Sequence, residues 1–330
     1  TGGSMITGLK CLGTTESGRV DTYIAGALID IDSDSVLVQS RGEGTSNTIF
    51  GKDAGDSIAS GGNYNTLFGE DAGTAITTGD NNTIIGYLAG DALSTTSEVT
   101  LIGRNAGSAI NHTDAIGSTA IGFYAMNANT SGVGNVAIGS QTLKNNLIGD
   151  YNTAVGTNAL TAFVAAGDGE GANTAVGYNA GIYLEEGENN TFVGRGAGSG
   201  VSGDKIDGDN NTCLGYLAGY TLTGAVAGNT LVGSIAGKLI TTGVNNVYMG
   251  LGAGATVSTG AQNVGIGWYS GGGTGGNPLT GDNNVCVGYS AGKALEGIAT
   301  KNTIVGTSSG DAMTTNAGCV LVGHAAGGAI

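Results

Sequence analysis

The stretch Asn173-Thr174-Ala175-Val176-Gly177-Tyr178-Asn179-Ala180-Gly181 decides the fold, because the same phrase recurs along most of the chain. Each copy reads Asn-Thr, two apolar residues, Gly, two variable residues and Ala-Gly, with further clear copies from Asn65 and Asn302. Alignment gives sixteen copies from residue 47 onward, each marked by the glycine after the apolar pair, which we call the anchor glycine. The anchors are Gly51, Gly69, Gly86, Gly103, Gly122, Gly139, Gly156, Gly177, Gly194, Gly215, Gly233, Gly250, Gly267, Gly288, Gly306 and Gly323.

The spacing of the anchors predicts one structural coil per repeat. Successive anchors are 17 residues apart in eight cases and never closer, and the other spacings are 18, 19 or 21. A fixed minimum with additions only indicates that extra residues bulge out at a tolerant corner. The three 21-residue spacings add loops over residues 161–172, 200–209 and 271–282. Such loops are either recognition sites or neutral insertions.

The composition excludes several classes of protein. The chain has 66 glycines among 330 residues and one proline, which argues against a helical protein and against collagen. Apolar residues are 40% of the chain, so disorder fits poorly. A net charge of −15 makes nucleic acid an unsuitable partner. No apolar run is long enough to span a membrane.

The three residues before each anchor glycine predict a short β-strand. The first is Thr or Val in every copy, and the third is a branched aliphatic residue, Phe or Met. Strand side chains alternate, so the first and third residues share one face and the middle residue faces the other way. The middle residues are also mostly apolar, which indicates burial on both faces. A single-layer coil covers one face by itself, so we expect a second chain on the other, most simply by cyclic symmetry.

The predicted fold class is all-β, a parallel β-solenoid with one coil per 17–21-residue repeat and a homotrimeric assembly. Sixteen coils would form a rod of roughly 75 Å. Residues 47–330 form the solenoid, and residues 1–46 form a β-rich N-terminal cap or junction segment. A coil that orders several glycines for one or two buried apolar side chains is marginal by itself, so an isolated monomer is not expected to be stable.

At Asn135-Val136-Ala137-Ile138-Gly139, at Ser118-Thr119-Ala120-Ile121-Gly122 and at 173–177 the chain resembles the head domains of trimeric autotransporter adhesins. Its longer phrase is similar to runs in bacteriophage tail-fibre proteins. The resemblance covers residues 47–330, although adhesin heads use shorter coils and lack the Ala-Gly half. It implies a left-handed parallel β-roll of three chains around a threefold axis, used for attachment.

The resemblance also implies which residues lie inside. In adhesin heads the two residues flanking the small middle residue point into the roll, and the small residue faces the partner chains. A charge at Val176 would then be buried unpaired and prevent folding. Carried over, the solenoid interior is Ile85, Ile102, Ile138, Val155, Val176, Val193, Val232 and Val305, and the trimer interface is Ala120, Ala137, Ala154, Ala175, Phe192 and Leu231.

The residue directly after the anchor glycine varies between charged and aromatic types, which predicts a solvent face. Aromatic side chains there could stack on sugar rings, or they could pack against each other from coil to coil. The candidates for surface recognition are Tyr87, Tyr178, Tyr216, Trp268 and Tyr289.

No catalytic set is evident, and the chain is not predicted to be an enzyme. The two histidines, His112 and His324, lie in distant coils and cannot act together. No cofactor is predicted. Calcium is a weak candidate for the acidic segment 30–34, which lacks the EF-hand pattern, and for the loop of Asp204, Asp207 and Asp209. The simpler alternative for both is a solvated acidic turn.

The cysteines favour free thiols. Cys213 and Cys286 occupy the middle strand position four coils apart, roughly 19 Å, so they cannot form a disulfide within the chain. Cys319 lies two coils from Cys286, and Cys11 has no assigned place. Unpaired thiols fit folding in a reducing cytoplasm better than export, which favours a virion protein over an exported adhesin.

These features predict a structural and attachment segment of a phage or virus fibre. The expected partners are two further copies of the chain, other virion or fibre proteins at both ends, and a host-surface glycan or protein. The expected location is the virion, or otherwise the cell surface. The alternative is the head of a bacterial trimeric adhesin. An ice-binding solenoid is a third class, disfavoured because the Thr column is expected to point inward.

Overall fold

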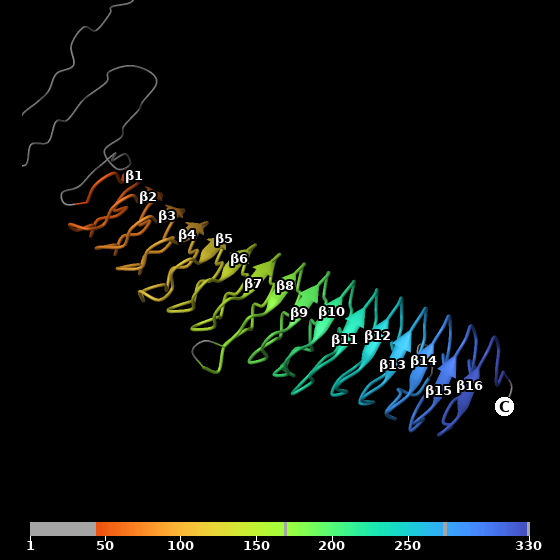
Figure 1. The fold of residues 1–330 in the computed structure, drawn as a ribbon. Coiled ribbons are helices and arrows are strands. Elements are labelled where there is room, and N and C mark those ends of the chain that lie inside the picture. Colours follow the sequence, from red (N-terminus) through yellow and green to blue (C-terminus); the bar gives the residue numbers. More distant parts are fainter. Residues whose placement is uncertain (1–43, 168–169, 273–275, 329–330) are drawn as a thin grey trace, which may run out of the picture.

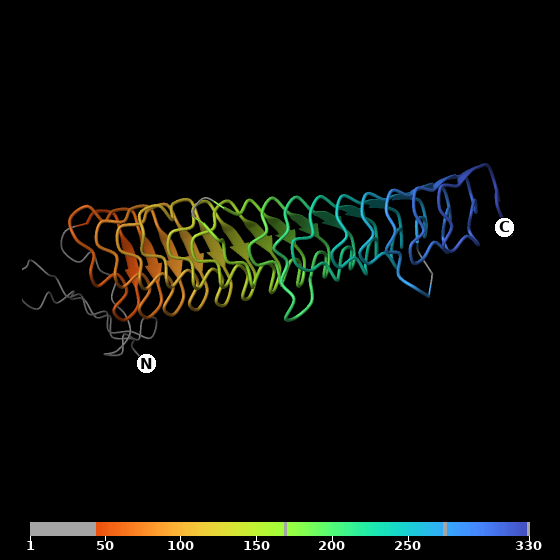
Figure 2. The same cartoon turned by 90° about the horizontal axis from the view of Figure 1, so that it is seen from below.

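The computed structural model describes residues 44–167, 170–272 and 276–328, which form one continuous stack of coils (Figure 1). The predicted segment 1–46 falls almost wholly outside these residues, as do Cys11 and the acidic segment 30–34. Figure 2, turned by 90°, shows that the stack is a rod, with the strands gathered on one side and turns on the others. No helix occurs in the described part of the chain. The predicted β-solenoid is confirmed.

Every predicted strand is present, and each is three residues long and ends just before an anchor glycine. The strands are β1 (Thr48–Phe50), β2 (Thr66–Phe68), β3 (Thr83–Ile85), β4 (Thr100–Ile102), β5 (Thr119–Ile121), β6 (Val136–Ile138), β7 (Thr153–Val155), β8 (Thr174–Val176), β9 (Thr191–Val193), β10 (Thr212–Leu214), β11 (Thr230–Val232), β12 (Val247–Met249), β13 (Val264–Ile266), β14 (Val285–Val287), β15 (Thr303–Val305) and β16 (Val320–Val322). They form one parallel sheet in sequence order, in which equivalent residues of neighbouring coils are paired, as Ala175 is with Phe192.

Backbone hydrogen bonds also join the coils outside the sheet. Along the turn side, Asp71 N donates to Lys52 O at 3.0 Å, and Thr77 N donates to Ser94 O at 2.8 Å. Equivalent bonds recur from coil to coil around the whole circumference. Each coil is therefore a template for the backbone of the next, and we name each coil by its strand.

Four positions in each coil have a positive φ, which explains why glycine recurs at fixed places in the repeat. In the β8 coil these are Ala172 (52°), Gly177 (139°), Asn179 (57°) and Gly181 (59°). Three of the four lie in the left-handed helical region, which non-glycine residues, Asn above all, enter at modest cost. The anchor position, with φ between 122° and 144° across the coils, is held by glycine alone.

The anchor glycine is also the point of closest approach between coils. A Cβ atom built on Gly177 would lie 2.5 Å from the carbonyl oxygen of Gly194, the next anchor. The same oxygen would be met at 2.2–2.8 Å in every coil from β1 to β15. Steric exclusion and backbone conformation therefore both require glycine at this position.

A buried asparagine ladder runs beside the sheet. The Asn173 side-chain oxygen accepts hydrogen bonds from Asn190 N (2.9 Å) and Asn190 Nδ2 (3.2 Å), and Asn173 Nδ2 donates to Gly187 O (2.9 Å). Both asparagines are buried, so these bonds satisfy backbone groups that water does not reach. The ladder is interrupted at Val99, whose own N–H still donates to the side chain of Asn82 at 3.1 Å.

The core inside each coil is built from three rows of apolar side chains. The middle strand residue supplies one row, the alanine three positions after the anchor supplies the second, and a large aliphatic residue farther along the turn supplies the third. In the β3 coil these residues are Ile84, Ala89 and Leu93, all fully buried. The largest middle residues are Phe192 and Tyr248, also fully buried.

The predicted assignment of inside and outside is wrong: the two faces of the strands are exchanged. Ile138 and Val176 are 38% and 37% exposed. The rest of the predicted interior is only half-buried, on the same outward side: Ile85, Ile102, Val155, Val193, Val232 and Val305. The predicted trimer interface is instead fully buried within the coil's own core: Ala120, Ala137, Ala154, Ala175, Phe192 and Leu231.

The Ala-Gly half of the repeat explains this exchange. Its alanine lies behind the sheet, and with the aliphatic row it provides the apolar surface that the middle strand residue covers. Adhesin heads lack this half, so the orientation carried over from them does not apply. The threonines of the first strand column therefore also point outward and are half-buried or exposed.

Two neighbouring substitutions test the corrected orientation. Ala175→Asp would place an unpaired charge in the core, and we expect a loss of at least about 4 kcal/mol and failure to fold. Val176→Asp lies on the outward face, and we expect the coil to keep its native circular dichroism spectrum. A folded Ala175→Asp protein beside an unfolded Val176→Asp protein would restore the original assignment.

The anchor glycine is tested by Gly177→Ala. We expect a cost of about 2–6 kcal/mol, because backbone strain adds to steric overlap with the next coil. The matched control is Gly117→Ala, since Gly117 also has a positive φ (67°) and corresponds to Ala172 of the β8 coil. No atom lies within 4 Å of a Cβ atom built on Gly117. Thermal unfolding followed by circular dichroism should show a much larger decrease for Gly177→Ala, and equal decreases would contradict the close-approach argument.

Candidate functional site

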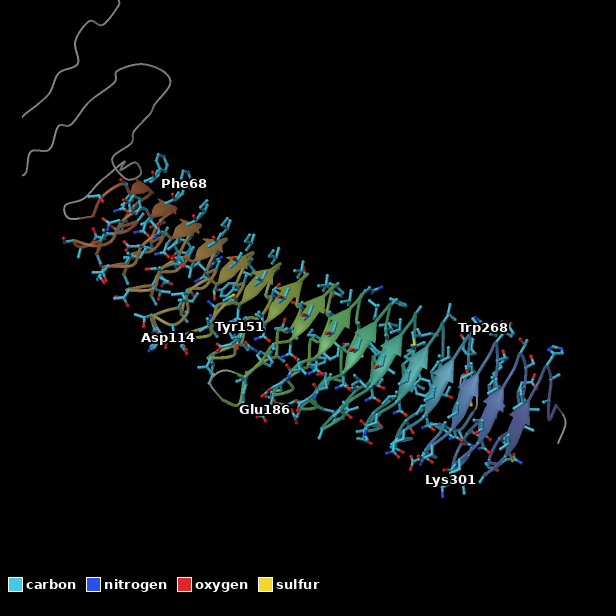
Figure 3. The ribbon with its side chains drawn as sticks, viewed as in Figure 1. Phe68, Asp114, Tyr151, Glu186, Trp268 and Lys301 are labelled. Carbon is cyan, nitrogen blue, oxygen red and sulfur yellow. The ribbon has the colours of Figure 1, made fainter. Side chains whose placement is uncertain are left out.

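The outward side of the sheet is an apolar face that runs along the whole rod. We call it the outer face and define it as the first and third residues of all strands. Its exposed members include Phe68 (52%), Leu214 (44%) and Met249 (42%). Figure 3 shows Phe68 and Trp268 projecting from the strand side, whereas Asp114 and Lys301 project from the opposite edge. Large apolar side chains in an unbroken row are unusual on a surface that contacts only water.

Beside the outer face, the residues directly after the anchor glycines form a second row, in which two arginines each lie between two aromatic rings. The Arg104 guanidinium lies 5.8 Å from the ring centroids of both Tyr87 and Phe123. Arg195 lies in the same way between Tyr178 (5.9 Å) and Tyr216 (5.8 Å). These cation–π contacts join side chains of three successive coils.

The five predicted recognition residues all lie in this second row and are exposed, but they do not form one site. Trp268 and Tyr289 stack on each other, with centroids 4.7 Å apart and planes 6° from parallel. Tyr178 and Tyr216 share Arg195, and Tyr87 belongs to the separate Arg104 stack. The rings therefore pack against residues of neighbouring coils, which was one of the two interpretations of this row. Their exposed fractions of 38–52% still leave ring surface available to a ligand.

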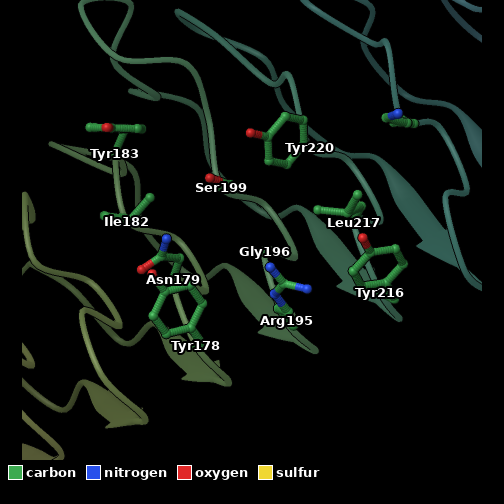
Figure 4. Close-up of a pocket in the computed structure, with 11 residues that line it drawn as sticks. Tyr178, Asn179, Ile182, Tyr183, Arg195, Gly196, Ser199, Tyr216, Leu217 and Tyr220 are labelled. Carbon is green, nitrogen blue, oxygen red and sulfur yellow. The ribbon is translucent and has the colours of Figure 1, made fainter.

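A groove of about 450 Å³ opens beside the Arg195 stack (Figure 4). It crosses the β8 to β11 coils and is lined by Tyr178, Asn179, Ile182, Tyr183, Arg195, Gly196, Ser199, Tyr216, Leu217, Tyr220 and Lys238. We call it the tyrosine groove.

The tyrosine groove exists because the β9 coil has small residues where its neighbours have large ones. Gly196 and Ser199, both buried, form its floor. Tyr183 of the β8 coil and Tyr220 of the β10 coil rise on either side. Sequence reasoning did not find these four residues or Lys238, although a glycine in place of a bulkier residue after Arg195 was a readable signal.

Two aspartates of the turns accept hydrogen bonds from backbone N–H groups of neighbouring coils. Asp209 Oδ1 accepts a hydrogen bond from Glu188 N (2.8 Å), and Asp282 Oδ1 accepts one from Ala261 N (2.8 Å). Burial, with the nearby charges of Glu170 and Asp209, raises the pKa of Glu188 above its usual range. Within the described ranges no group of three His, Cys, Asp or Glu residues could hold a metal, and the predicted acidic loop at Asp204 is not such a group.

The remaining titratable candidates do not form a catalytic arrangement. His112 Nδ1 lies 3.2 Å from Asp114 Oδ2, and both side chains are exposed. Cys213, Cys286 and Cys319 are free thiols, as predicted. Burial raises the pKa of Cys286 to about 12 and that of Cys213 still further. Neither thiol is suited to nucleophilic chemistry at neutral pH.

Four buried polar side-chain atoms of the described residues have no hydrogen-bond partner, and the Tyr248 hydroxyl belongs to the largest of these side chains. The Tyr248 hydroxyl is fully buried in the core and makes no hydrogen bond within the described residues. Burial raises the pKa of Tyr248 well above its ordinary value. Gly265 of the next coil makes room for this ring, since a Cβ there would lie 2.6 Å from Tyr248 Cδ1.

No protein family and no curated protein matches this chain. No helix of the described residues is long and apolar enough to cross a membrane. The surfaces that can carry a function are therefore sought on the chain itself, and they are the outer face and the tyrosine groove.

The buried thiols predict alkaline lability. In the unfolded chain Cys286 ionises near its ordinary pKa of 9.0, but in the folded chain only near 12. The unfolded state thus loses its proton first, and the free energy of unfolding should fall by up to about 1.4 kcal/mol per pH unit between those values.

The measurement is the denaturant midpoint between pH 8 and pH 11. Cys286→Ala should reduce the fall of the denaturant midpoint with rising pH, because it removes the buried thiol. The fold should tolerate it, because alanine is a common middle residue of the repeat. Cys319→Ser, at a more exposed position where Ser118 stands in another coil, should leave the slope unchanged. An unchanged slope in Cys286→Ala would contradict this assignment.

Proposed function

We propose that this chain is a structural and attachment segment of a phage or virus fibre, in which three copies pack together through their outer faces. The observation that supports this most is the outer face itself. It presents a large apolar side chain at every coil from β1 to β16, and the chain has nothing of its own among the described residues to cover them.

The chemistry of the outer face favours packing against protein. Its first column holds either Thr or Val, which have nearly the same shape, and its third column is apolar throughout. The first column therefore has a constant side-chain shape, but it does not have a hydroxyl group in every coil. A surface that preserves shape and apolar character is suited to contact with another apolar surface.

The size of the outer face also suits an association between copies. Sixteen coils extend roughly 75 Å, and a three-residue strand is about 10 Å wide, which gives roughly 750 Å² per chain. A stable interface buries about 800 Å² per partner. Three such faces around an axis parallel to the rod would bury one another along its length. Other fibre or virion proteins are the further proposed partners.

The head of a bacterial surface adhesin would use the same packing, and free Cys213 and Cys286 favour the virion. Ice binding is the second candidate, because the threonines point outward, contrary to the prediction, and form a regular row. Against it, Val replaces Thr at Val136, Val247, Val264, Val285 and Val320, which interrupts the hydroxyl row.

Sedimentation equilibrium tests the proposal. We expect the protein at micromolar concentration to have three times the chain mass. The double variant Ile138→Lys/Leu214→Lys should shift it to monomer or to aggregates, because both residues lie on the outer face and are exposed in the single chain.

The control is Tyr151→Lys, an exposed site away from the sheet that corresponds to Lys301 in another coil. It should leave the mass unchanged. A compact, folded wild-type monomer would contradict the proposed assembly, and thermal hysteresis in such a monomer would favour ice binding instead.

A further inference from the structure

We propose that the tyrosine groove binds a saccharide that carries a carboxylate group. This proposal deepens the attachment role and rests on it for its biological meaning. Its physical basis is independent of the assembly, because the groove residues follow the anchor glycines whereas the outer face precedes them. The groove therefore opens beside the outer face, on the turn side of the rod.

The charge of the groove is opposite to that of the protein. The chain has 26 acidic and 11 basic residues, yet the groove lining includes Arg195 and Lys238 and no carboxylate. Within the part of the chain that the structure describes, neither cation takes part in an ion pair. A ligand with a carboxylate would supply the partner that both cations lack.

Arg195 is held ready for such a partner. Its guanidinium lies between the rings of Tyr178 and Tyr216, which orients it without using its N–H groups. The backbone fixes the spacing of the stack, because Gly196 N donates to Tyr178 O (2.9 Å) and Leu217 N donates to Arg195 O (3.0 Å). Little conformational entropy is then lost when the guanidinium forms a bidentate contact.

The aromatic walls indicate a ring-shaped ligand. Tyr183 and Tyr220 stand on coils two steps apart, roughly 9.6 Å between backbones, with Gly196 and Ser199 between them. Tyr178, Tyr216 and Tyr220 are 51%, 47% and 38% exposed. A pyranose ring presents C–H groups to such ring faces and hydroxyl groups to tyrosine oxygens. A volume of about 450 Å³ is within the usual range of small-molecule sites.

Two comparisons within the chain single out this coil. The Arg104 stack has the same cation–π contacts, but Asn105 occupies the position of Gly196, with a similar φ of 56° against 63°. At Gly252, the other equivalent glycine, the ring of Tyr269 covers the space, since a Cβ there would lie 2.7 Å from it. A Cβ atom on Gly196 would lie 2.8 Å from Leu217 Cδ2, and the nearest ring, that of Tyr220, would be 3.7 Å away, so Gly196 is bordered by an aliphatic side chain and is not covered by a ring.

Isothermal titration of the folded protein with trigalacturonic acid tests the proposal, with the trimethyl ester of the same saccharide as the uncharged probe. We expect the acid to bind at least tenfold more tightly than the ester. Arg195→Gln should weaken binding of the acid at least tenfold. Gly196→Asn, which copies Asn105 into the groove floor, should do the same. Arg104→Gln is the matched control and should not change it.

Each variant is first checked by circular dichroism and sedimentation, so that loss of binding is separated from loss of the fold or of the assembly. Equal binding of acid and ester would overturn the role of the carboxylate. The site assignment would be overturned if the acid did not bind, if Gly196→Asn had no effect, or if Arg104→Gln weakened binding equally. Tighter binding of a tri-glutamate peptide would overturn the saccharide assignment. None of these results changes the mass that tests the proposed assembly.

Discussion

The close approach of successive anchor glycines sets the geometry on which the whole rod depends. A side chain at Gly177 would overlap the carbonyl oxygen of Gly194, so the coils reach sheet spacing only because every copy keeps glycine there. At that spacing Asn173 reaches the backbone and side chain of Asn190, and the strands pair in register. A stack of weak individual coils thereby gains its stability from the contacts between neighbours. The same regularity carries every surface column along the rod without interruption.

The repeat, its strands and its coil count could be predicted because they depend on local spacing, which the sequence records directly. The direction of the side chains could not. Alternation shows that Ala175 and Val176 face opposite ways, but which one faces inward depends on what lies behind the sheet. Here that is the alanine row, represented by Ala180 in the β8 coil, together with the aliphatic row of the turn. The size of Phe192 and Tyr248 in the middle column was the available clue, since such rings need the full interior of a coil.

The exchange of faces changes the reason for expecting an assembly, without removing it. In the arrangement predicted from the sequence, small residues such as Ala137 would line a tight axis between chains. In the observed structure, larger side chains such as Ile138 and Leu214 are outside, and they leave more apolar surface uncovered than alanine would. The observed outer face would therefore gain more from contact with a second chain than a face of alanines would. It also explains why Thr and Val interchange in the first column, where shape matters more than the hydroxyl.

A perfect repeat can offer only rows, so a distinct site requires a copy that departs from its neighbours. The β9 coil is such a copy, because it combines Arg195 with the small Gly196 and Ser199. The comparable copies lack this combination: Arg104 has the same stack with Asn105 at the position of Gly196, and Gly252 lies beneath the ring of Tyr269. Sequence columns revealed the aromatic row but not the groove, because the groove depends on residues of three coils at once. In a repeat protein of this kind, neighbouring copies that depart together from the common residue types are the best indication of a binding site.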